Sequence, residues 1–179
     1  NSSSKDLLLR LGKSNATVSG DTRFDRVAAI LEKDNHLDFI SEFKNNLLTI
    51  VVGSSWPKDE KILVDYINAT SHQVKFIIAP HNIKSDQIQE LQKTITKKTV
   101  LFSEKEGKNL AEYDVFIINT IGILTKIYSE ADIAYVGGGF GNPGVHNLLE
   151  PATFGVPIVL GPNYSHFAEA TALVNLGGC

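Results

Sequence analysis

The stretch LLTIVVGSSWP, residues 47–57, indicates the fold class of this chain, because it joins a buried strand to a helix through a short turn. Residues 47–52 are rich in branched side chains and are apolar except for Thr49, as is typical of parallel strands that are buried on both faces. Gly53 permits a tight turn, and Pro57 suits the first turn of a helix. A helix is therefore predicted over residues 56–69.

The same strand–turn–helix pattern recurs along the rest of the chain. Apolar runs predict five further strands, at residues 75–79, 99–102, 115–118, 133–136 and 157–160. Helical spacing predicts further helices at residues 24–32, 85–94, 122–130, 147–154 and 167–175. Strands that alternate with helices through short loops form a parallel sheet covered on both faces. The predicted fold class is therefore α/β, with a doubly wound, six-stranded parallel Rossmann-like sheet.

The two ends of the chain differ from this pattern. Residues 1–22 are mixed and polar, so they are interpreted as a tail or as a linker from a preceding domain. Residues 23–179 are predicted to form one domain. The sequence contains no methionine and ends abruptly after an apolar segment, at Cys179. We therefore expect a fragment of a longer protein, with a domain that is truncated at its C-terminus.

Composition and charge argue against several classes of function. Apolar residues make up 42% of the chain and charged residues 21%, which is ordinary for a globular protein. The net charge is −3 without any block of Lys and Arg, which gives no support for binding to nucleic acid or to a membrane surface. No apolar run reaches the roughly 18–20 residues of a membrane span, and no signal peptide is visible. A single cysteine allows no disulfide framework and fits a reducing, cytoplasmic compartment.

The turn after the first strand is a candidate ligand site, because ligands of such sheets bind at the carboxyl ends of the strands. Ser54 or Ser55 can cap the helix that follows. The free N–H groups at that helix end can also bind a phosphate or a carboxylate. The sequence leaves both interpretations open.

Two further turns carry candidate residues. Pro80 and His81 follow the second strand, and a histidine there either faces a ligand or is simply solvated. Ile121 and Gly122 follow the fourth strand, where backbone groups either approach a nucleobase or form a plain turn.

The loop at residues 137–151, GGGFGNPGVHNLLEP, is the strongest candidate site. Five of its first eight residues are glycine, which costs chain entropy and is usual where backbone needs positive φ angles or touches a ligand. Gly138 and Gly139 are therefore candidate ligand contacts. The pattern Gly139-x-Gly141-x-x-Gly144 matches the dinucleotide-binding fingerprint. We reject that match, because the fingerprint belongs to a first strand–helix turn and needs an acidic residue about 20 positions further on.

Asn147 and Glu150 follow the glycine run and lie three residues apart. This spacing predicts that they share one face of the first helical turn. The helix dipole alone would mildly stabilise Glu150 there. A carboxylate can also accept hydrogen bonds from the two neighbouring hydroxyls of a ribose. The room that the glycines leave for a ligand favours the second interpretation.

Taken together, these segments resemble the Kdo transferases, which attach 3-deoxy-D-manno-octulosonic acid to lipid A precursors. The matching pieces are GDTRFD at 20–25, GSSWP at 53–57, IAYVGG at 133–138, HNLLEP at 146–151 and PIVLGP at 157–162. They occur in the order of the family and extend over about residues 18–178. The HNxxEP piece is the most specific, and other two-domain glycosyltransferases share it more loosely.

The resemblance implies the C-terminal, donor-binding domain of a two-Rossmann-domain (GT-B type) glycosyltransferase of lipopolysaccharide biosynthesis. Residues 23–179 would bind the nucleotide sugar CMP-Kdo, without a metal or another cofactor. The lipid A precursor and the catalytic base would belong to a missing N-terminal domain, so this fragment alone would be inactive. The whole enzyme would act at the cytoplasmic face of the inner membrane of a Gram-negative bacterium. The fragment itself is expected to contact neither membrane nor nucleic acid.

The resemblance also assigns roles to the residues of the matching motifs. Ser54 and Ser55 would face the phosphate or carboxylate of the donor. Asn147 would hold the phosphate, and Glu150 would hold the ribose. His146 begins the most specific motif and belongs to the predicted set of donor contacts, as do Pro80, His81, Gly138 and Gly139.

Two positions depart from the pattern of the family. The family commonly has Pro-Arg-His after the second strand, whereas this chain has Pro80-His81-Asn82, so an anion contact would be lost or taken over by His81. After the fourth strand the family often has Met-Gly-Glu, whereas this chain has Ile121-Gly122-Ile123. Ile121 and Gly122 would still lie beside the cytosine, but a contact through that glutamate is impossible here.

Alternatives remain open at this stage. One is another GT-B enzyme, either a transferase or an epimerase, that uses a UDP- or GDP-sugar. The sequence separates these donors poorly, because their bases are recognised largely by backbone groups. Another alternative is a non-catalytic nucleotide-binding module. The concentration of glycine and polar residues at the carboxyl ends of the strands argues against it.

Overall fold

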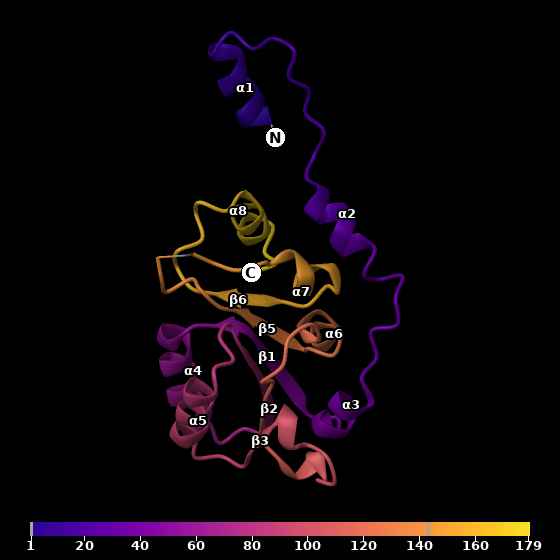
Figure 1. Ribbon diagram of the computed structural model, residues 1–179, viewed down its shortest axis with the longest axis vertical. Coiled ribbons are helices and arrows are strands. Elements are labelled where there is room, and N and C mark those ends of the chain that lie inside the picture. Colours follow the sequence, from indigo (N-terminus) through magenta and orange to yellow (C-terminus); the bar gives the residue numbers. More distant parts are fainter. Residues whose placement is uncertain (1, 143) are drawn as a thin grey trace.

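A computed structural model describes residues 2–142 and 144–179 as a parallel sheet with helices on both faces (Figure 1). The six strands pair in the order β3-β4-β2-β1-β5-β6, and every pair is parallel. The strands are β1 (Leu48–Ser55), β2 (Val74–Pro80), β3 (Thr99–Leu101), β4 (Val115–Ile117), β5 (Ile133–Val136) and β6 (Ile158–Leu160). The predicted α/β, Rossmann-like fold class is confirmed, with all six strands at their expected places.

The helices follow the strands as predicted, with a few additions. The α-helices are α1 (Ser2–Arg10), α2 (Thr22–Ala28), α3 (Asp38–Lys44), α4 (Pro57–Ala69), α5 (Ser85–Thr94), α6 (Leu124–Tyr128), α7 (Leu149–Thr153) and α8 (Ala168–Asn175). Two short 3-10 turns, η1 (Phe102–Glu104) and η2 (Leu110–Glu112), flank the connection from β3 to β4.

The core consists of two hydrophobic clusters, one on each face of the sheet. Neighbouring strand residues point to opposite faces, so Val51 belongs to one cluster and Val52 to the other. Helices α4 and α5 cover the face of Val52, whereas α3, α6 and α8 contribute to the cluster of Val51. This arrangement is the physical basis of the long apolar runs in the sequence, since strands buried on both faces need apolar residues at nearly every position.

The strand order places a topological switch point between β1 and β5. From β1 the chain moves to β2 and to β3 at the edge of the sheet, returns to β4 between them, and then crosses through α6 to β5 on the other side of β1. Connections that leave two adjacent strands in opposite directions open a crevice at the carboxyl ends of those strands. Gly53 of β1 is paired with Val136 of β5, so the turn after β1 and the glycine loop after β5 leave the sheet side by side.

Three elements differ from the sequence-based expectations. Helix α3 was not predicted, although its Ile40 and Phe43 are completely buried. Residues 1–22 contain the helix α1, which Figure 1 shows at a distance from the sheet. The helix predicted at residues 122–130 begins only at Leu124, because Gly122 adopts a φ of 88°, outside the range of a right-handed helix.

The predicted capping of α4 by Ser54 or Ser55 is wrong. Strand β1 continues through Ser55, and Trp56 occupies the position before the first helical residue. The carboxylate of Asp59, three residues into the helix, accepts a hydrogen bond from the Trp56 N–H at 2.9 Å. Ser55 Oγ instead donates a hydrogen bond to Glu60 Oε1 at 2.9 Å. The hydrogen bond to a backbone N–H at the start of α4 is therefore made by the carboxylate of Asp59 and not by a serine.

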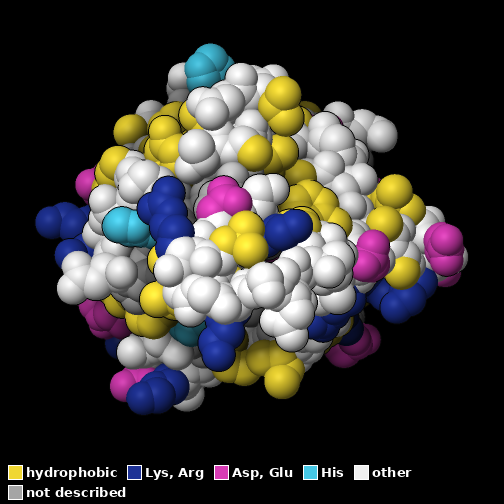
Figure 2. All heavy atoms as spheres, turned by 90° about the horizontal axis from the view of Figure 1, so that it is seen from above, with side chains coloured by type: hydrophobic (Ala, Val, Ile, Leu, Met, Phe, Trp, Pro, Cys, Tyr) yellow, Lys and Arg dark blue, Asp and Glu magenta, His cyan; other side chains and the backbone are white. Residues whose placement is uncertain are grey.

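The outer surface carries charges of both signs. Figure 2 shows the molecule from the end at which α1 lies, with basic, acidic and hydrophobic side chains interspersed over this face. In the ranges 2–142 and 144–179, no helix is long and apolar enough to cross a membrane.

Candidate functional site

A pocket of about 390 Å³ opens at the switch point between β1 and β5. It is formed by the end of β1, the residue after β2, helix α6 with Gly122 before it, and the end of the glycine loop with the start of α7. The residues that line it are Ser54, His81, Gly122, Leu124, Thr125, Tyr128, His146, Asn147 and Glu150. The structure thus brings together six of the eleven candidate contacts, drawn from four separate loops of the sequence.

Three other candidates lie outside this pocket. Ser55 and Pro80 line a separate groove between α4 and α5. The Ile121 side chain is 81% exposed and is adjacent in sequence to Gly122 of the pocket. Of the two serines at the end of β1, it is therefore Ser54 that faces the pocket, with a positive φ of 52° that is uncommon for a residue other than glycine.

Gly138 and Gly139 determine how closely the glycine loop packs. Gly138 has a φ of 97°, and a Cβ atom on it would lie 2.2 Å from the carbonyl oxygen of Gly144. A Cβ atom on Gly139 would lie 2.7 Å from the backbone of Gly161. Both glycines permit backbone to contact backbone, so the loop folds back tightly and brings the segment that begins with His146 to the pocket.

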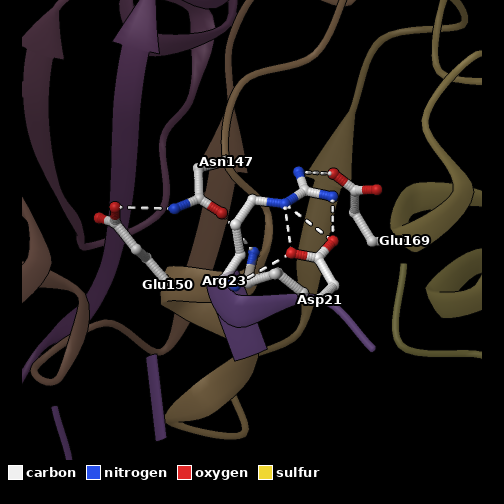
Figure 3. Close-up of polar contacts among 6 residues, drawn as sticks. Asp21, Arg23, Asn147, Glu150 and Glu169 are labelled. Atoms are coloured by element: carbon white, nitrogen blue, oxygen red, sulfur yellow. Dashed lines mark hydrogen bonds and ion pairs between the residues drawn. The ribbon is translucent and has the colours of Figure 1, made fainter. Parts of the chain in front are cut away.

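Glu150 is held in place by one hydrogen bond on each carboxylate oxygen. Asn147 Nδ2 donates to Glu150 Oε1 at 2.9 Å, as Figure 3 shows, and Thr125 Oγ1 donates to Glu150 Oε2 at 2.7 Å. Asn147 precedes α7, contrary to the predicted helical turn, and its Oδ1 accepts the N–H of Leu149 at 3.1 Å. Each oxygen of a carboxylate can accept two hydrogen bonds, so Glu150 keeps one acceptor position per oxygen for a ligand.

A cluster of three aromatic rings forms one wall of the site. The Trp56 ring stacks on His81 with centroids 4.4 Å apart, and the rings of His81 and His146 are 4.5 Å apart. Trp56 Nε1 donates a hydrogen bond to His146 Nε2 at 2.8 Å. An indole nitrogen can only donate, so Nε2 of His146 carries no proton and its Nδ1 does. Burial, and then the charge of His81, lowers the pKa of His146, which favours this neutral form.

The pH dependence of this cluster is a testable prediction. Protonation of His146 breaks its hydrogen bond with Trp56, and a protonated histidine beside an indole quenches the emission of the indole. The pKa of His146 in the folded protein lies below the ordinary value of 6.5, so the unfolded chain takes up the proton first as the pH falls. The free energy of unfolding therefore decreases as the pH falls from 6.5 through the pKa of His146 in the folded protein. Emission of Trp56, the only tryptophan, should therefore decrease with a midpoint below pH 6.5.

A His146→Gln variant should remove this transition, whereas replacement of the exposed His72 by Gln should leave it unchanged. A midpoint at or above pH 6.5 in the unchanged chain would contradict the proposed neutral state of His146.

The buried carboxylate of Asp59 connects the two loops that flank the pocket. Besides the Trp56 N–H, it accepts the N–H of Gly138 at 2.9 Å and the Tyr135 hydroxyl at 2.7 Å. Only 1% of Asp59 is exposed. Burial and the hydrogen bond to Asp59 raise the pKa of Tyr135, so its hydroxyl remains a donor. Asp59 thereby fixes the position of the turn after β1 relative to the glycine loop.

Sequence reasoning missed several residues of the site, among them Trp56, Asp59, Thr125 and Tyr128. An acidic residue three positions into α4 is the one available signal for Asp59, since carboxylates are typical there. Tyr128 is buried and packs directly against Gly53. A Cβ atom on Gly53 would lie 1.8 Å from the Tyr128 hydroxyl oxygen, so this contact requires glycine. Burial, and then the charge of Glu150, raises the pKa of Tyr128. The pocket therefore contains a neutral phenol near a carboxylate.

Metal ligands do not gather in the part of the chain that the structure describes. No group of three or more His, Cys, Asp or Glu side chains there could hold a metal ion. The arrangement instead offers a carboxylate, hydroxyls and imidazoles around a narrow pocket. These groups are suited to hydrogen bonds with a polar ligand of moderate size.

Comparison of the sequence with known proteins gives several relatives, although no protein-family model matches. A 3-deoxy-D-manno-octulosonic acid transferase from Chlamydophila psittaci is 30% identical over 183 residues, which cover 98% of this chain and 42% of the relative. The enzyme of the same name from Aquifex aeolicus is 36% identical over 121 residues, covering 65% of this chain and 32% of the relative. The chain thus spans less than half of the length of these relatives.

A solved structure is similar in fold. The crystal structure of the C-terminal CMP-Kdo binding domain of WaaA from Acinetobacter baumannii aligns with a TM-score of 0.62. The alignment covers 85% of this chain and 77% of that domain, at 24% sequence identity. The doubly wound architecture is therefore shared with that domain.

Proposed function

We propose that residues 23–179 form the donor-binding domain of a 3-deoxy-D-manno-octulosonic acid (Kdo) transferase and bind CMP-Kdo, because this chain is a homologue of these transferases. The observation that carries this proposal is the pocket between β1 and β5, in which Glu150 is oriented by Thr125 and Asn147. A doubly wound domain binds nucleotides at such a switch point.

The groups around the pocket suggest how the nucleotide would lie. Glu150 has acceptor positions left for the two ribose hydroxyls. Ser54 and His81 also line the pocket, Asn147 lies beside Glu150, and all three can donate hydrogen bonds to a phosphate. The backbone at Gly122, open because glycine has no side chain, is available to the base.

In the whole protein, we propose transfer of the sugar by direct displacement. An acceptor hydroxyl forms the new bond to the anomeric carbon, while the bond from that carbon to the phosphate oxygen of CMP breaks and its electrons leave with CMP. A carboxylate of a preceding domain takes the proton of the hydroxyl. The hydrogen-bond donors of this domain stabilise the leaving phosphate. The proposed acceptor is a lipid A precursor at the cytoplasmic face of the inner membrane, and no metal or other cofactor is expected to take part.

Titration of the chain with nucleotides, followed by the emission of Trp56, tests the proposal. Trp56 contacts two histidines of the site, so a ligand there should change its environment. CMP is expected to give a saturable change with a dissociation constant of roughly 1 μM–1 mM, the range in which enzymes usually hold their substrates. UDP and GDP serve as matched controls and should bind more weakly.

Two results would contradict the proposal. A clear preference for UDP or GDP would overturn the CMP-Kdo assignment and favour another GT-B enzyme. The absence of a response to all three nucleotides, with no shift of pocket amides by NMR, would remove the nucleotide-binding function itself.

A further inference from the structure

The segment before the sheet forms a second wall beside the proposed donor pocket. Arg23 of α2 is clasped by two acids: its guanidinium donates to Asp21 at 2.7 Å and to Glu169 of α8 at 2.6 Å (Figure 3). Only 10% of the Glu169 side chain is exposed. Val27, one turn further along, is 8% exposed. Helix α2 is thus fixed against the domain next to α7.

The same segment is fixed again at its other end. Ser129 Oγ, just after α6, shares its proton between the carbonyl of Lys126 at 2.7 Å and that of Asn35 at 3.3 Å. His36 lies 3.2 Å from Glu130, and this contact raises the pKa of His36. Asn35 Nδ2 closes the turn by donating to the carbonyl of Ile30 at 2.8 Å. Residues 21–36 are therefore anchored at both ends, with their middle part opposite α6 and α7.

A cleft of about 550 Å³ lies between this segment and the domain. The segment lines it with Arg23, Arg26, Val27, Ile30, Lys33 and Asn35, and the domain contributes mainly α6, α7 and the end of the glycine loop. The cleft shares five residues with the donor pocket: Gly122, Thr125, His146, Asn147 and Glu150. The two cavities are therefore contiguous.

The charges along the cleft are unbalanced. Arg23 is neutralised by Asp21 and Glu169. Lys126 of α6, and Arg26 and Lys33 of the segment, also line the cleft, and within residues 2–142 and 144–179 none of these three has an ion pair. Glu150 is the single other carboxylate of the lining. Because the chain as a whole has a net charge of −3, this excess of cations is a local feature.

We propose that Arg26, Lys33 and Lys126 form an anion subsite, which binds a carboxylate or phosphate group next to the nucleotide. The inference rests on the proposed function for the identity of the neighbouring ligand, but the subsite itself rests on the cleft and its charges. Two sources of the anion fit this chemistry: the sugar acid of the donor, or a phosphate group on the acceptor. In both cases the segment of residues 21–36, which precedes the sheet, takes part in binding.

The test uses the isotope-labelled 179-residue chain with saturating CMP, and titrates it by NMR with inorganic phosphate or with free Kdo. Both probes should shift the amides of Arg26 and Lys126, and tighter binding by one of them identifies the source. An Arg26→Gln/Lys126→Gln double variant should bind the preferred probe about tenfold more weakly, as expected for the loss of charge-assisted hydrogen bonds. The matched control, Lys61→Gln/Lys93→Gln, removes two exposed cations from α4 and α5 and should change nothing.

The outcomes separate this inference from the proposed function. Unchanged affinity for both probes in the Arg26/Lys126 double variant, or no amide shifts with either probe, would overturn the subsite even where CMP binds. Binding of phosphate or Kdo that depends on Arg26 and Lys126, in a chain that does not respond to CMP, would support the subsite and count against the nucleotide assignment alone.

Discussion

An Asp59→Ala variant is expected to lose about 3–6 kcal/mol of unfolding free energy, because the N–H groups of Trp56 and Gly138 and the Tyr135 hydroxyl would lose their acceptor. Each of these donors would then be buried without a partner, or would need water to enter the core. A domain has a total stability of only about 5–15 kcal/mol, so the loss is a large fraction of it.

Urea unfolding followed by circular dichroism measures this loss. The control is Asp65→Ala, on an exposed face of the same helix, which is expected to change the stability by less than about 0.5 kcal/mol. Asp59→Asn keeps one acceptor oxygen, but its amide group replaces the other oxygen and faces a hydrogen-bond donor. An intermediate loss of unfolding free energy is therefore expected. A loss of less than about 1 kcal/mol in Asp59→Ala would show that the loops hold their positions without the carboxylate.

The strands and the core on both faces of the sheet could be predicted from the sequence, because a strand that is buried on both faces appears in it as a continuous apolar run. Residues 47–52 and 115–118 contain almost only apolar residues, and no other element of this length needs such a composition. Helix α3 does not show a recognisable apolar pattern in the sequence. It is only seven residues long, and its buried Ile40 and Phe43 are too few to establish a helical period.

The site could be predicted only where one loop contained the pattern. The spacing of Asn147 and Glu150 predicts that they share one face of a helical turn; in the structure Asn147 precedes α7, but its side chain still donates a hydrogen bond to Glu150. Thr125 lines the pocket and Trp56 contacts its two histidines, although both residues are far from Asn147 and Glu150 in sequence. The strand order brings them there, which no local pattern reveals. The position of Asp59 in a first helical turn explains its charge equally well without any contact to the glycine loop.

The serine prediction failed for a related physical reason. Ser54 and Ser55 precede a helix in the sequence, which is typical of capping residues. Strand β1 is longer than its apolar run and continues through Ser55, so the chain has not yet turned when the serines occur. Trp56 then takes the position before the helix, and its ring is free to stack on His81. The pocket thus gains an aromatic wall where a cap was expected.

A Glu150→Gln variant is expected to weaken the binding of CMP at least tenfold, on the proposal that its carboxylate holds the ribose. A hydrogen bond to a charged group contributes about 1.5–3 kcal/mol, and roughly 1.4 kcal/mol corresponds to a tenfold change in affinity. Gln keeps the size of the side chain, but it replaces one acceptor oxygen with a donor that cannot pair with the Thr125 hydroxyl in its present orientation. Dissociation constants are measured by isothermal titration calorimetry.

Binding of 2′-deoxy-CMP separates a contact with the ribose from a general disturbance of the pocket. The unchanged chain should bind 2′-deoxy-CMP several-fold more weakly than CMP, whereas Glu150→Gln should bind both with similar affinity, since the missing hydroxyl no longer has its charged partner. Glu60→Gln, which alters a half-buried carboxylate on α4 in the neighbouring groove, should preserve the preference for CMP. If Glu150→Gln prefers CMP over 2′-deoxy-CMP as strongly as the unchanged chain does, Glu150 does not bind the ribose hydroxyls. Its role is then limited to the hydrogen bonds with Thr125 and Asn147 at the start of α7.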